Sequence, residues 1–200
     1  MGASDDPKPI PLAEARHHMA NVFQLLGALG RLRLQRSDDA EARRQVAWLN
    51  EAIAAQGVLQ HRLLSPGGSD FGAFLNDMQP HWKRRIGARP IELVVRADPL
   101  LVNEQAASAL ATIVQELVLN AVTHAFPDDR AGTIRVSLSR AGEGRGVLSV
   151  SDDGVGYAED AVDKSRLGLW LIAALANQVK GAFTTTRQTG VTASLEFALA

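Results

Sequence analysis

Cysteine is absent from the sequence, which excludes disulfide bonds, thiolate metal sites and cysteine nucleophiles. The first eleven residues are polar and contain proline, so they do not resemble a signal peptide. No run approaches the roughly 18 apolar residues that a membrane helix requires. These absences predict a cytoplasmic protein with no membrane partner.

The charged residues leave little excess of either sign. The sequence has 21 lysines and arginines against 22 aspartates and glutamates. Proteins that bind nucleic acids depend largely on positive charge that neutralises phosphates, so we expect no nucleic-acid partner. Apolar residues make up 46% of the 200 residues, as in a globular protein. This length allows one ordinary domain, or a small element followed by one domain.

Residues 11–66 predict a helical hairpin. Apolar residues recur there at alternating spacings of three and four, as in the seam of a coiled coil. The seam consists of Leu12, Ala15, Met19, Val22, Leu26 and Leu29. A turn at residues 37–39 leads into a second apolar stripe, which ends at the proline and glycines of residues 65–68. Because one hairpin buries little apolar surface against itself, we expect two copies to pair into a four-helix bundle.

The remaining sequence mixes strand-like and helical segments. Strands are predicted at residues 91–95, 133–138, 146–150, 183–187 and 192–197. Helices are predicted at residues 71–82, 104–125 and 169–179. The predicted fold class is α+β, with a flexible N-terminus (residues 1–10), the hairpin (residues 11–66) and an α/β sandwich (residues 67–200). The sandwich should contain a mixed sheet with helices on one face.

Two adjacent histidines on the first predicted helix differ in orientation. At about 100° per residue, His17 points roughly 160° away from the apolar seam, whereas His18 lies only about 60° from it. Asn21 and Gln24 follow on the same exposed side as His17. His17 is therefore the candidate nucleophile, since a bulky nucleotide-binding domain can reach it. Taken alone, this helix also fits a pair of ordinary surface and boundary histidines.

The predicted helix of residues 104–125 carries a polar stripe within an apolar sequence. Glu116, Asn120 and His124 recur at a spacing of four and so share one helix face. Burying such groups costs stability unless they find partners. Mg²⁺ and phosphate oxygens would be suitable partners, with the Asn120 amide oxygen as a neutral metal ligand. A satisfied hydrogen-bond network in the core is the alternative.

A glycine-containing loop follows the strand predicted at residues 146–150. Asp152 stands at its start, where a carboxylate can accept a hydrogen bond from an amine such as that of adenine. Gly154 and Gly156 permit a close approach that a side chain would block. Alone this signal is weak, because Asp-Gly turns are common in hairpins.

Two further clusters lie later in the chain. Gly168 opens a predicted helix, where free backbone N–H groups favour phosphate. Lys164 and Arg166 precede it, and they either approach a triphosphate or are solvated loop charges. Residues 189–192 form the last and weakest cluster. The four clusters in this order are much more specific than any one of them.

Together these motifs resemble those of the histidine kinases of two-component systems. Residues 14–24 resemble the phosphoacceptor motif of the HWE-like subfamily, whose ATP lid is short, with His17 as the acceptor. Residues 116–127 resemble the N box, residues 152–156 the G1 box and residues 167–169 a reduced G2 box of a GHKL-type ATP-binding domain. The resemblance covers residues 11–198. It departs from the family pattern at His18 and Arg166.

The resemblance implies roles for the N-box residues. Glu116 and Asn120 would activate the histidine and hold Mg²⁺, and His124 would be a lesser polar member of the box.

The resemblance also implies roles for the glycine-containing segments. Asp152 would bind the adenine of ATP, and Gly154 and Gly156 would shape the pocket around it. Gly168 would begin the phosphate-binding helix.

The implied activity is that of an ATP-dependent protein histidine kinase. His17 would take the γ-phosphoryl group of ATP and pass it to an aspartate of a response-regulator receiver domain. A second copy of the chain and, because no sensor domain is evident, a separate sensor protein are the other expected partners. A histidine phosphotransferase that works without ATP is one alternative, and a GHKL anti-sigma serine kinase is another. The complete glycine loop opposes the first, and the histidine-bearing hairpin opposes the second.

Overall fold

The computed structural model describes residues 12–36, 38–63, 70–156, 166–187 and 189–199. Within these ranges, the side chains of residues 12–20, 36, 41, 44, 166, 167 and 169 are not described. The chain divides into two compact units, Met1–Pro66 and Gly67–Ala200.

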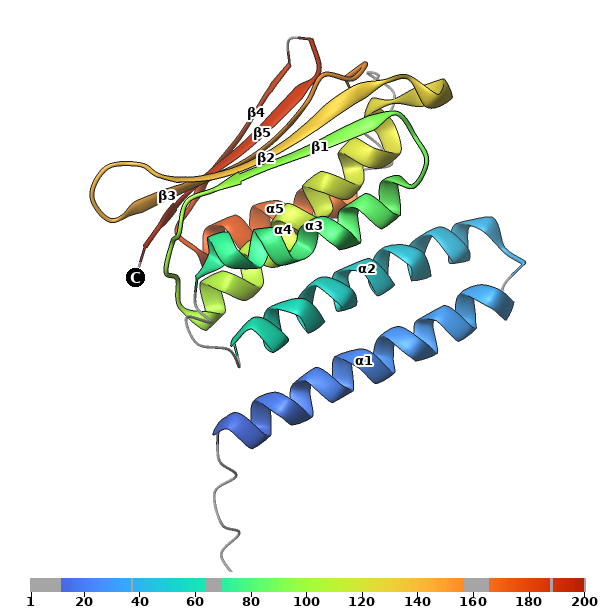
Figure 1. Ribbon diagram of the computed structural model, residues 1–200, viewed down its shortest axis with the longest axis horizontal. Helices are drawn as coiled ribbons and strands as arrows, with labels where there is room; N and C mark the ends of the chain where they lie inside the picture. The colour runs from blue at the N-terminus through green and yellow to red at the C-terminus, as the bar shows by residue number, and fades with distance from the viewer. Residues whose placement is uncertain (1–11, 37, 64–69, 157–165, 188, 200) are drawn as a thin grey trace, which may run out of the picture. The chain divides into compact units, whose positions relative to one another are not determined.

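The first unit is a hairpin of two helices, α1 (Leu12–Arg36) and α2 (Ala40–Leu63), drawn in blue to teal in Figure 1. Asp39 precedes α2, and its carboxylate accepts a hydrogen bond from Ala42 N at 3.4 Å. An aspartate at this position satisfies a backbone N–H group that the helix itself leaves without a partner. The pair of helices predicted from the apolar spacing is present.

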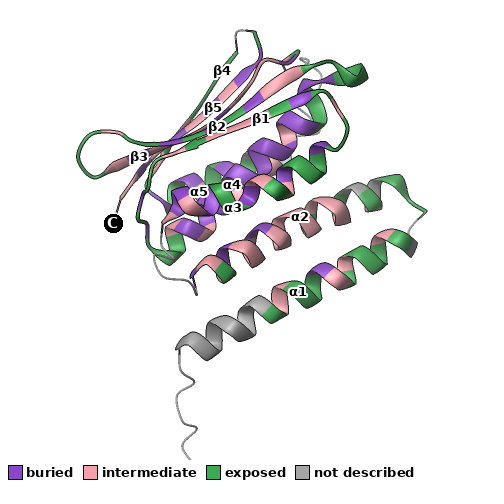
Figure 2. Ribbon diagram, viewed as in Figure 1, coloured by how far each residue is buried: buried purple, intermediate pink, exposed green. Residues whose placement is uncertain are grey.

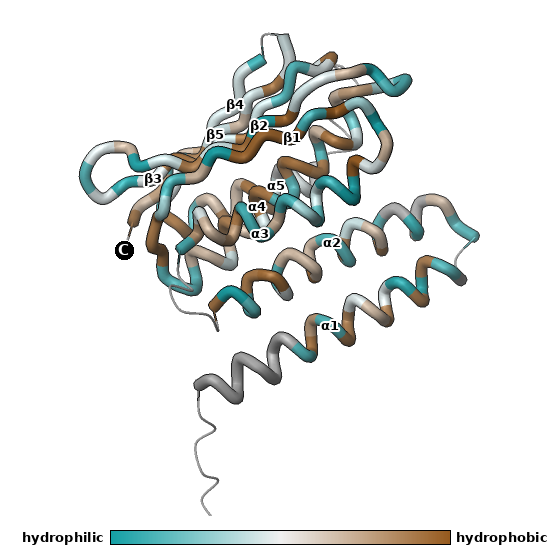
Figure 3. Tube along the Cα trace, in the orientation of Figure 1, coloured by the Kyte–Doolittle hydropathy of each residue, from teal (hydrophilic) through white to brown (hydrophobic). Residues whose placement is uncertain are grey.

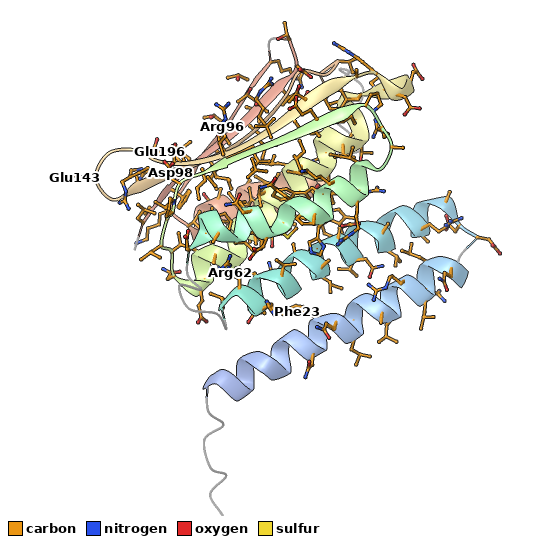
Figure 4. The ribbon with its side chains drawn as sticks, in the orientation of Figure 1. Phe23, Arg62, Arg96, Asp98, Glu143 and Glu196 are labelled. Atoms are coloured by element: carbon orange, nitrogen blue, oxygen red, sulfur yellow. The ribbon has the colours of Figure 1, made fainter. Side chains whose placement is uncertain are left out.

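The two helices approach each other along a stripe that contains glycine. A Cβ atom at Gly30 would lie 2.1 Å from Asn50 Oδ1, and one at Gly57 would lie 3.7 Å from Phe23 Cβ. Phe23 lies on the α2 side of α1 (Figure 4). Leu26 and Leu29 of the predicted seam are 43% and 53% exposed, so they are not buried against α2. Glycine allows α2 to pack against the neighbouring face of α1 instead.

The second unit places helices on one face of a five-stranded sheet (Figure 1). The helices are α3 (Phe71–Ile86), α4 (Glu104–Asn120) and α5 (Arg166–Gln178). The strands are β1 (Ile91–Ala97), β2 (Gly132–Arg140), β3 (Arg145–Asp152), β4 (Ala182–Arg187) and β5 (Val191–Ala198). Their order is β1-β2-β3-β5-β4, with β1 and β2 parallel and the other neighbours antiparallel. The predicted α+β fold with a mixed sheet is confirmed.

The core lies between the sheet and these helices. In β2, Ile134, Val136 and Leu138 are buried, whereas Arg135 and Ser137 between them are exposed. Successive strand residues point to opposite faces, so this pattern leaves one polar face of the sheet on the side away from the helices. Figure 2 shows buried residues along the strands and along the helices that cover the sheet.

Helix α4 changes geometry at its C-terminal end. It continues beyond Asn120 as a π-helical turn, η1 (Ala121–Ala125). The chain leaves helical geometry at Phe126, and a separate short 3-10 turn, η2 (Pro127–Asp129), follows. Within the described residues, the combined segment Glu104–Ala125 is long and apolar enough on average to cross a membrane, but 78% of its apolar window is buried inside the protein. Packing in the core accounts for this composition.

A buried hydrogen bond joins α3 to α4. Trp82 Nε1 donates to Gln115 Oε1 at 2.8 Å, and the two residues are only 1% and 2% exposed. A buried amide oxygen that loses its donor carries the full cost of its desolvation. This bond therefore fixes the packing of the two helices beneath the sheet.

We predict that Trp82→Phe lowers the free energy of unfolding by about 1–3 kcal/mol, because Gln115 Oε1 then lacks the Trp82 donor. Urea denaturation followed by circular dichroism measures this change. Trp170 is 67% exposed, so the matched control Trp170→Phe should change the free energy by no more than about 0.5 kcal/mol. Equal losses in the two variants would contradict the prediction.

Candidate nucleotide site

A pocket opens where the C-terminal end of α4 meets the C-terminal end of β3 and the start of β5. Its lining combines three polar side chains with small apolar ones. The lining residues are Leu117, Asn120, Ala121, His124, Ala125, Val150, Asp152, Gly156, Val191 and Ala193. Residues of the α4 stripe, of the glycine-containing loop and of the cluster at residues 189–192 therefore lie around one cavity. More than 60 residues of sequence separate the first of these clusters from the last.

One side of the pocket is built on the end of α4. Glu116 is 8% exposed, and Asn120 Nδ2 donates to its Oε1 atom at 3.4 Å. A Cβ atom at Gly168 would lie 2.2 Å from Glu116 Oε1. The start of α5 can therefore approach Glu116 this closely only because position 168 is glycine.

His124 does not continue the buried polar stripe that the spacing of four predicted. It is exposed at the rim of the pocket, whereas Glu116 is buried and Asn120 is half-buried. The physical reason is the π-helical turn after Asn120, which holds more residues per turn than an α-helix and so changes which face His124 occupies.

The other side of the pocket is the loop after β3. Asp152 Oδ1 accepts hydrogen bonds from Gly154 N at 3.0 Å and Val191 N at 3.4 Å. Burial raises the pKa of Asp152 above its ordinary value, and the neighbouring Asp153 charge raises it further, while the two backbone hydrogen bonds oppose this shift. An ionised Asp152 is therefore costly until a donor reaches it.

Close backbone contacts hold this loop in place. A Cβ atom at Gly154 would lie 2.2 Å from Ala125 O, and one at Gly190 would lie 2.0 Å from Asp152 O. Gly156 has φ of 74°, which favours glycine. The need for glycine at position 154 thus comes from the turn after α4, and the need at position 190 from the loop itself.

Sequence reasoning missed a second aspartate of this loop. Asp153 Oδ1 accepts a hydrogen bond from Thr133 N at 2.7 Å, and Arg130 Nη2 donates to Asp153 O at 3.3 Å. These bonds tie the loop to the start of β2. The sequence offered no periodic signal for them, because Asp153 and Thr133 are distant along the chain.

Three of the candidate residues are not placed by the described side chains. The helix of residues 12–36 contains His17, but its side chain lies outside the described residues. The same holds for Arg166, at the start of α5, and all of Lys164 lies in the undescribed segment 157–165. The predicted short lid falls in that segment.

Comparison with known proteins identifies the second unit. Residues 105–200 match the family described as histidine kinase-, DNA gyrase B- and HSP90-like ATPases. Most of the second unit is therefore similar to that ATPase family. Blue-light-activated histidine kinase 2 of Erythrobacter litoralis is 24% identical over 201 residues, covering 94% of this chain. The chain spans 58% of the length of that relative.

Solved structures show the same fold. The histidine kinase domain of the Erythrobacter litoralis EL346 blue-light-activated histidine kinase superposes with a TM-score of 0.71 at 21% identity, covering 90% of this chain and 94% of that one. Full-length ShkA in complex with AMPPNP has a TM-score of 0.55 at 24% identity, covering 94% of this chain and 46% of that one. With the family match, these likenesses show that the chain has the fold of a histidine kinase core that includes an ATPase-like domain.

We predict that Asp152→Asn makes the nucleotide-free histidine kinase core more stable at neutral pH. The raised pKa of Asp152 means that the folded state binds the proton more tightly than the unfolded state. In the wild type, protonated Asp152 therefore stabilises the fold at low pH, and this contribution is lost as the pH rises through the pKa of the folded state. Urea denaturation over a pH series should show the advantage of Asp152→Asn shrinking as the pH falls.

The matched control for this measurement is Asp98→Asn, at an exposed position of the same unit. It should give no gain that grows with pH. If Asp152→Asn destabilises the protein at every pH, burial is not the dominant influence on the pKa of Asp152.

Proposed function

We propose that this protein is an ATP-dependent protein histidine kinase that phosphorylates its own His17 and passes the phosphoryl group to an aspartate of a response-regulator receiver. The observation that carries the proposal is that Asn120, His124 and Asp152 line one pocket within an ATPase-family domain. The relatives named as histidine kinases support the same activity. ATP supply and soluble receivers make the cytoplasm the proposed location.

In this proposal the loop after β3 holds the base of the nucleotide. Val150, Val191 and Ala193 supply an apolar lining for a flat ring, and Asp152 supplies an acceptor for an exocyclic amine. Because burial makes ionised Asp152 costly, a donor at this position stabilises the carboxylate as well as the ligand. Gly156 leaves room beside the pocket for the rest of the nucleotide.

The other side of the pocket has the donor set that Mg²⁺ uses when it is held partly by phosphates. The Asn120 amide nitrogen faces Glu116 at 3.4 Å, so its oxygen is the atom available to a cation. Mg²⁺ keeps several waters and takes few protein ligands beside phosphate oxygens, so an amide with a carboxylate behind it suits the ion. Mg²⁺ bound there would neutralise charge on the transferred group.

Glu116 acts, in this proposal, mainly through Asn120. At 8% exposure its carboxylate lies under the start of α5, which limits its direct access to an incoming imidazole. A hydrogen bond from Asn120 to a buried carboxylate fixes the orientation of the amide. Accepting the His17 proton directly would require the start of α5 to move away from Glu116.

The chemical step belongs to His17. A neutral ring nitrogen attacks the γ-phosphorus of ATP, forming an N–P bond while the bond from phosphorus to the bridging oxygen breaks and ADP leaves. The ring then loses its N–H proton to a base or to water. In receiver phosphorylation histidine changes from nucleophile to leaving group. An aspartate oxygen attacks the phosphohistidine phosphorus, and the N–P bond to histidine breaks.

We predict that the purified protein incubated with Mg-ATP acquires phosphate that is labile to acid and stable to base. His17→Ala should abolish this label and His18→Ala, the matched control, should retain it. Asn120→Ala should lower the rate of labelling about 100-fold, because a group that orients charge at the transferred phosphoryl is lost. γ-Labelled ATP followed by gel autoradiography measures all four proteins.

Other outcomes of the labelling experiment select another function. Acid-stable label that persists in His17→Ala would identify a serine kinase instead. If the wild type binds no ATP yet accepts phosphate from a phosphorylated receiver, the protein is a phosphotransferase.

Pairing of two chains through the hairpin is part of the same proposal. Large apolar side chains are exposed along the first unit, and Figure 3 shows apolar positions recurring along α1. They are Leu25 at 60%, Leu26 at 43%, Leu29 at 53%, Leu32 at 51% and Leu49 at 50% exposure. Leu25, Leu29 and Leu32 recur at helical spacing on one side of α1, as in a bundle interface.

We predict that the double variant Leu25→Lys with Leu29→Lys is monomeric while the wild type is dimeric, since charge on this face opposes burial. Light scattering coupled to gel filtration distinguishes the two masses. The control Gln35→Lys adds charge at an exposed position of the same helix and should leave the dimer intact. A wild type that is monomeric at all concentrations would contradict the pairing.

A further inference from the structure

The turn that follows α4 leaves backbone carbonyl groups without partners inside the helix. The last carbonyls of any helix lack an intrahelical donor. Here the chain leaves helical geometry at Phe126, with φ of −127° and ψ of 71°, and Pro127 follows, which has no N–H group to donate. Partners for these carbonyls must therefore come from elsewhere in the fold.

Arg89 supplies those partners. Its Nη1 atom donates to Val122 O at 2.5 Å and its Nη2 atom donates to Phe126 O at 2.6 Å. A cation at the C-terminal end of a helix is also favoured by the helix dipole. From these contacts we propose that Arg89 is a positioning residue of the nucleotide site: it holds the π-helical turn that separates Asn120 from the glycine loop.

The position of this turn sets the width of the pocket. Val155 N donates to Ala125 O at 2.9 Å, so the glycine loop is attached directly to the turn. Asn120 stands at one end of the turn, and Asp152 starts the loop. A displacement of the turn therefore changes the distance between these two side chains, and errors of about 1 Å in such sites cost up to about 100-fold in rate.

The geometry requires arginine rather than any cation. The two acceptor carbonyls are four residues apart, and the planar guanidinium reaches both with separate nitrogens. A lysine ammonium is a single point donor on a flexible stem and lacks this fork. Arg89 Nε also lies 3.6 Å from Asp129 Oδ1, but Asp129 is 80% exposed, so this ion pair contributes little.

The backbone aims Arg89 at the turn. Gly87, with φ of 67°, ends α3, and Pro90 O accepts a hydrogen bond from Gly132 N at 3.1 Å at the start of β2. Arg89 lies between these two fixed points. It precedes residues 105–200 and so lies outside the family match.

This inference rests on the proposed function, and its test uses the full chain with AMPPNP and Mg²⁺ as the probe. Calorimetric titration compares the wild type with Arg89→Lys, Arg89→Gln and the control Arg96→Lys. Arg96 is an exposed residue of β1 (Figure 4). We expect affinity to fall about tenfold in both Arg89 variants and to be unchanged in Arg96→Lys.

Hydrogen exchange of the nucleotide-free proteins provides a readout that general destabilisation would not reproduce. In the Arg89 variants the amides of residues 121–126 and of Val155 should exchange faster, while those of β2, β3 and β5 keep their protection. Acceleration throughout the second unit would show a general structural role and overturn the inference.

The remaining outcomes separate the two proposals. If the wild type binds the probe and both Arg89→Lys and Arg89→Gln bind it equally well, Arg89 does not position the site and the proposed function stands. If Arg89→Lys keeps the wild-type affinity and Arg89→Gln loses it, positive charge alone is sufficient. That result would also overturn the role proposed for the guanidinium fork. If the wild type fails to bind, ATP-dependent function fails, and the positioning role falls with it.

Discussion

The hydrogen bond from Val155 N to Ala125 O joins the two halves of the pocket. One half belongs to a helix and the other to a loop after a strand, and neither forms a binding site alone. The contact is possible because position 154 is glycine, where a Cβ atom would lie 2.2 Å from Ala125 O. The relation between Asn120 and Asp152 therefore depends on backbone packing more than on either side chain.

The site also combines deep burial with polar chemistry. Helix α4 packs its apolar residues under the sheet, yet it carries Gln115 and Glu116, which are 2% and 8% exposed. Each has a partner: Trp82 donates to Gln115, and Asn120 donates to Glu116. A half-buried Asp152 lines the strand side of the pocket, with its pKa raised mainly by burial. Such groups reduce stability in the empty site, and a bound cation or amine would offset that cost.

Several parts of this architecture follow from the sequence because they depend on local pattern. The alternation of Ile134, Val136 and Leu138 with polar residues gives a strand with one buried face, as predicted. The glycine loop after β3 was also expected at its observed place. The spacing of apolar residues in α1 defines an apolar helix but not which of its faces α2 covers, and Leu26 and Leu29 are exposed in the single chain. Close contact at Gly30 decides that face.

The sequence by itself determined the order of helices and strands, the loop at residues 152–156 and the candidate residues on α4, because each depends on neighbours a few positions away. Tertiary structure decided that α4 widens into a π-helical turn, that His124 lies at the exposed rim, and that Asp153 is tied to Thr133. These features depend on contacts across many residues of sequence, such as Arg89 with Val122 and Phe126. No local spacing encodes a contact whose partner arrives only when the chain folds.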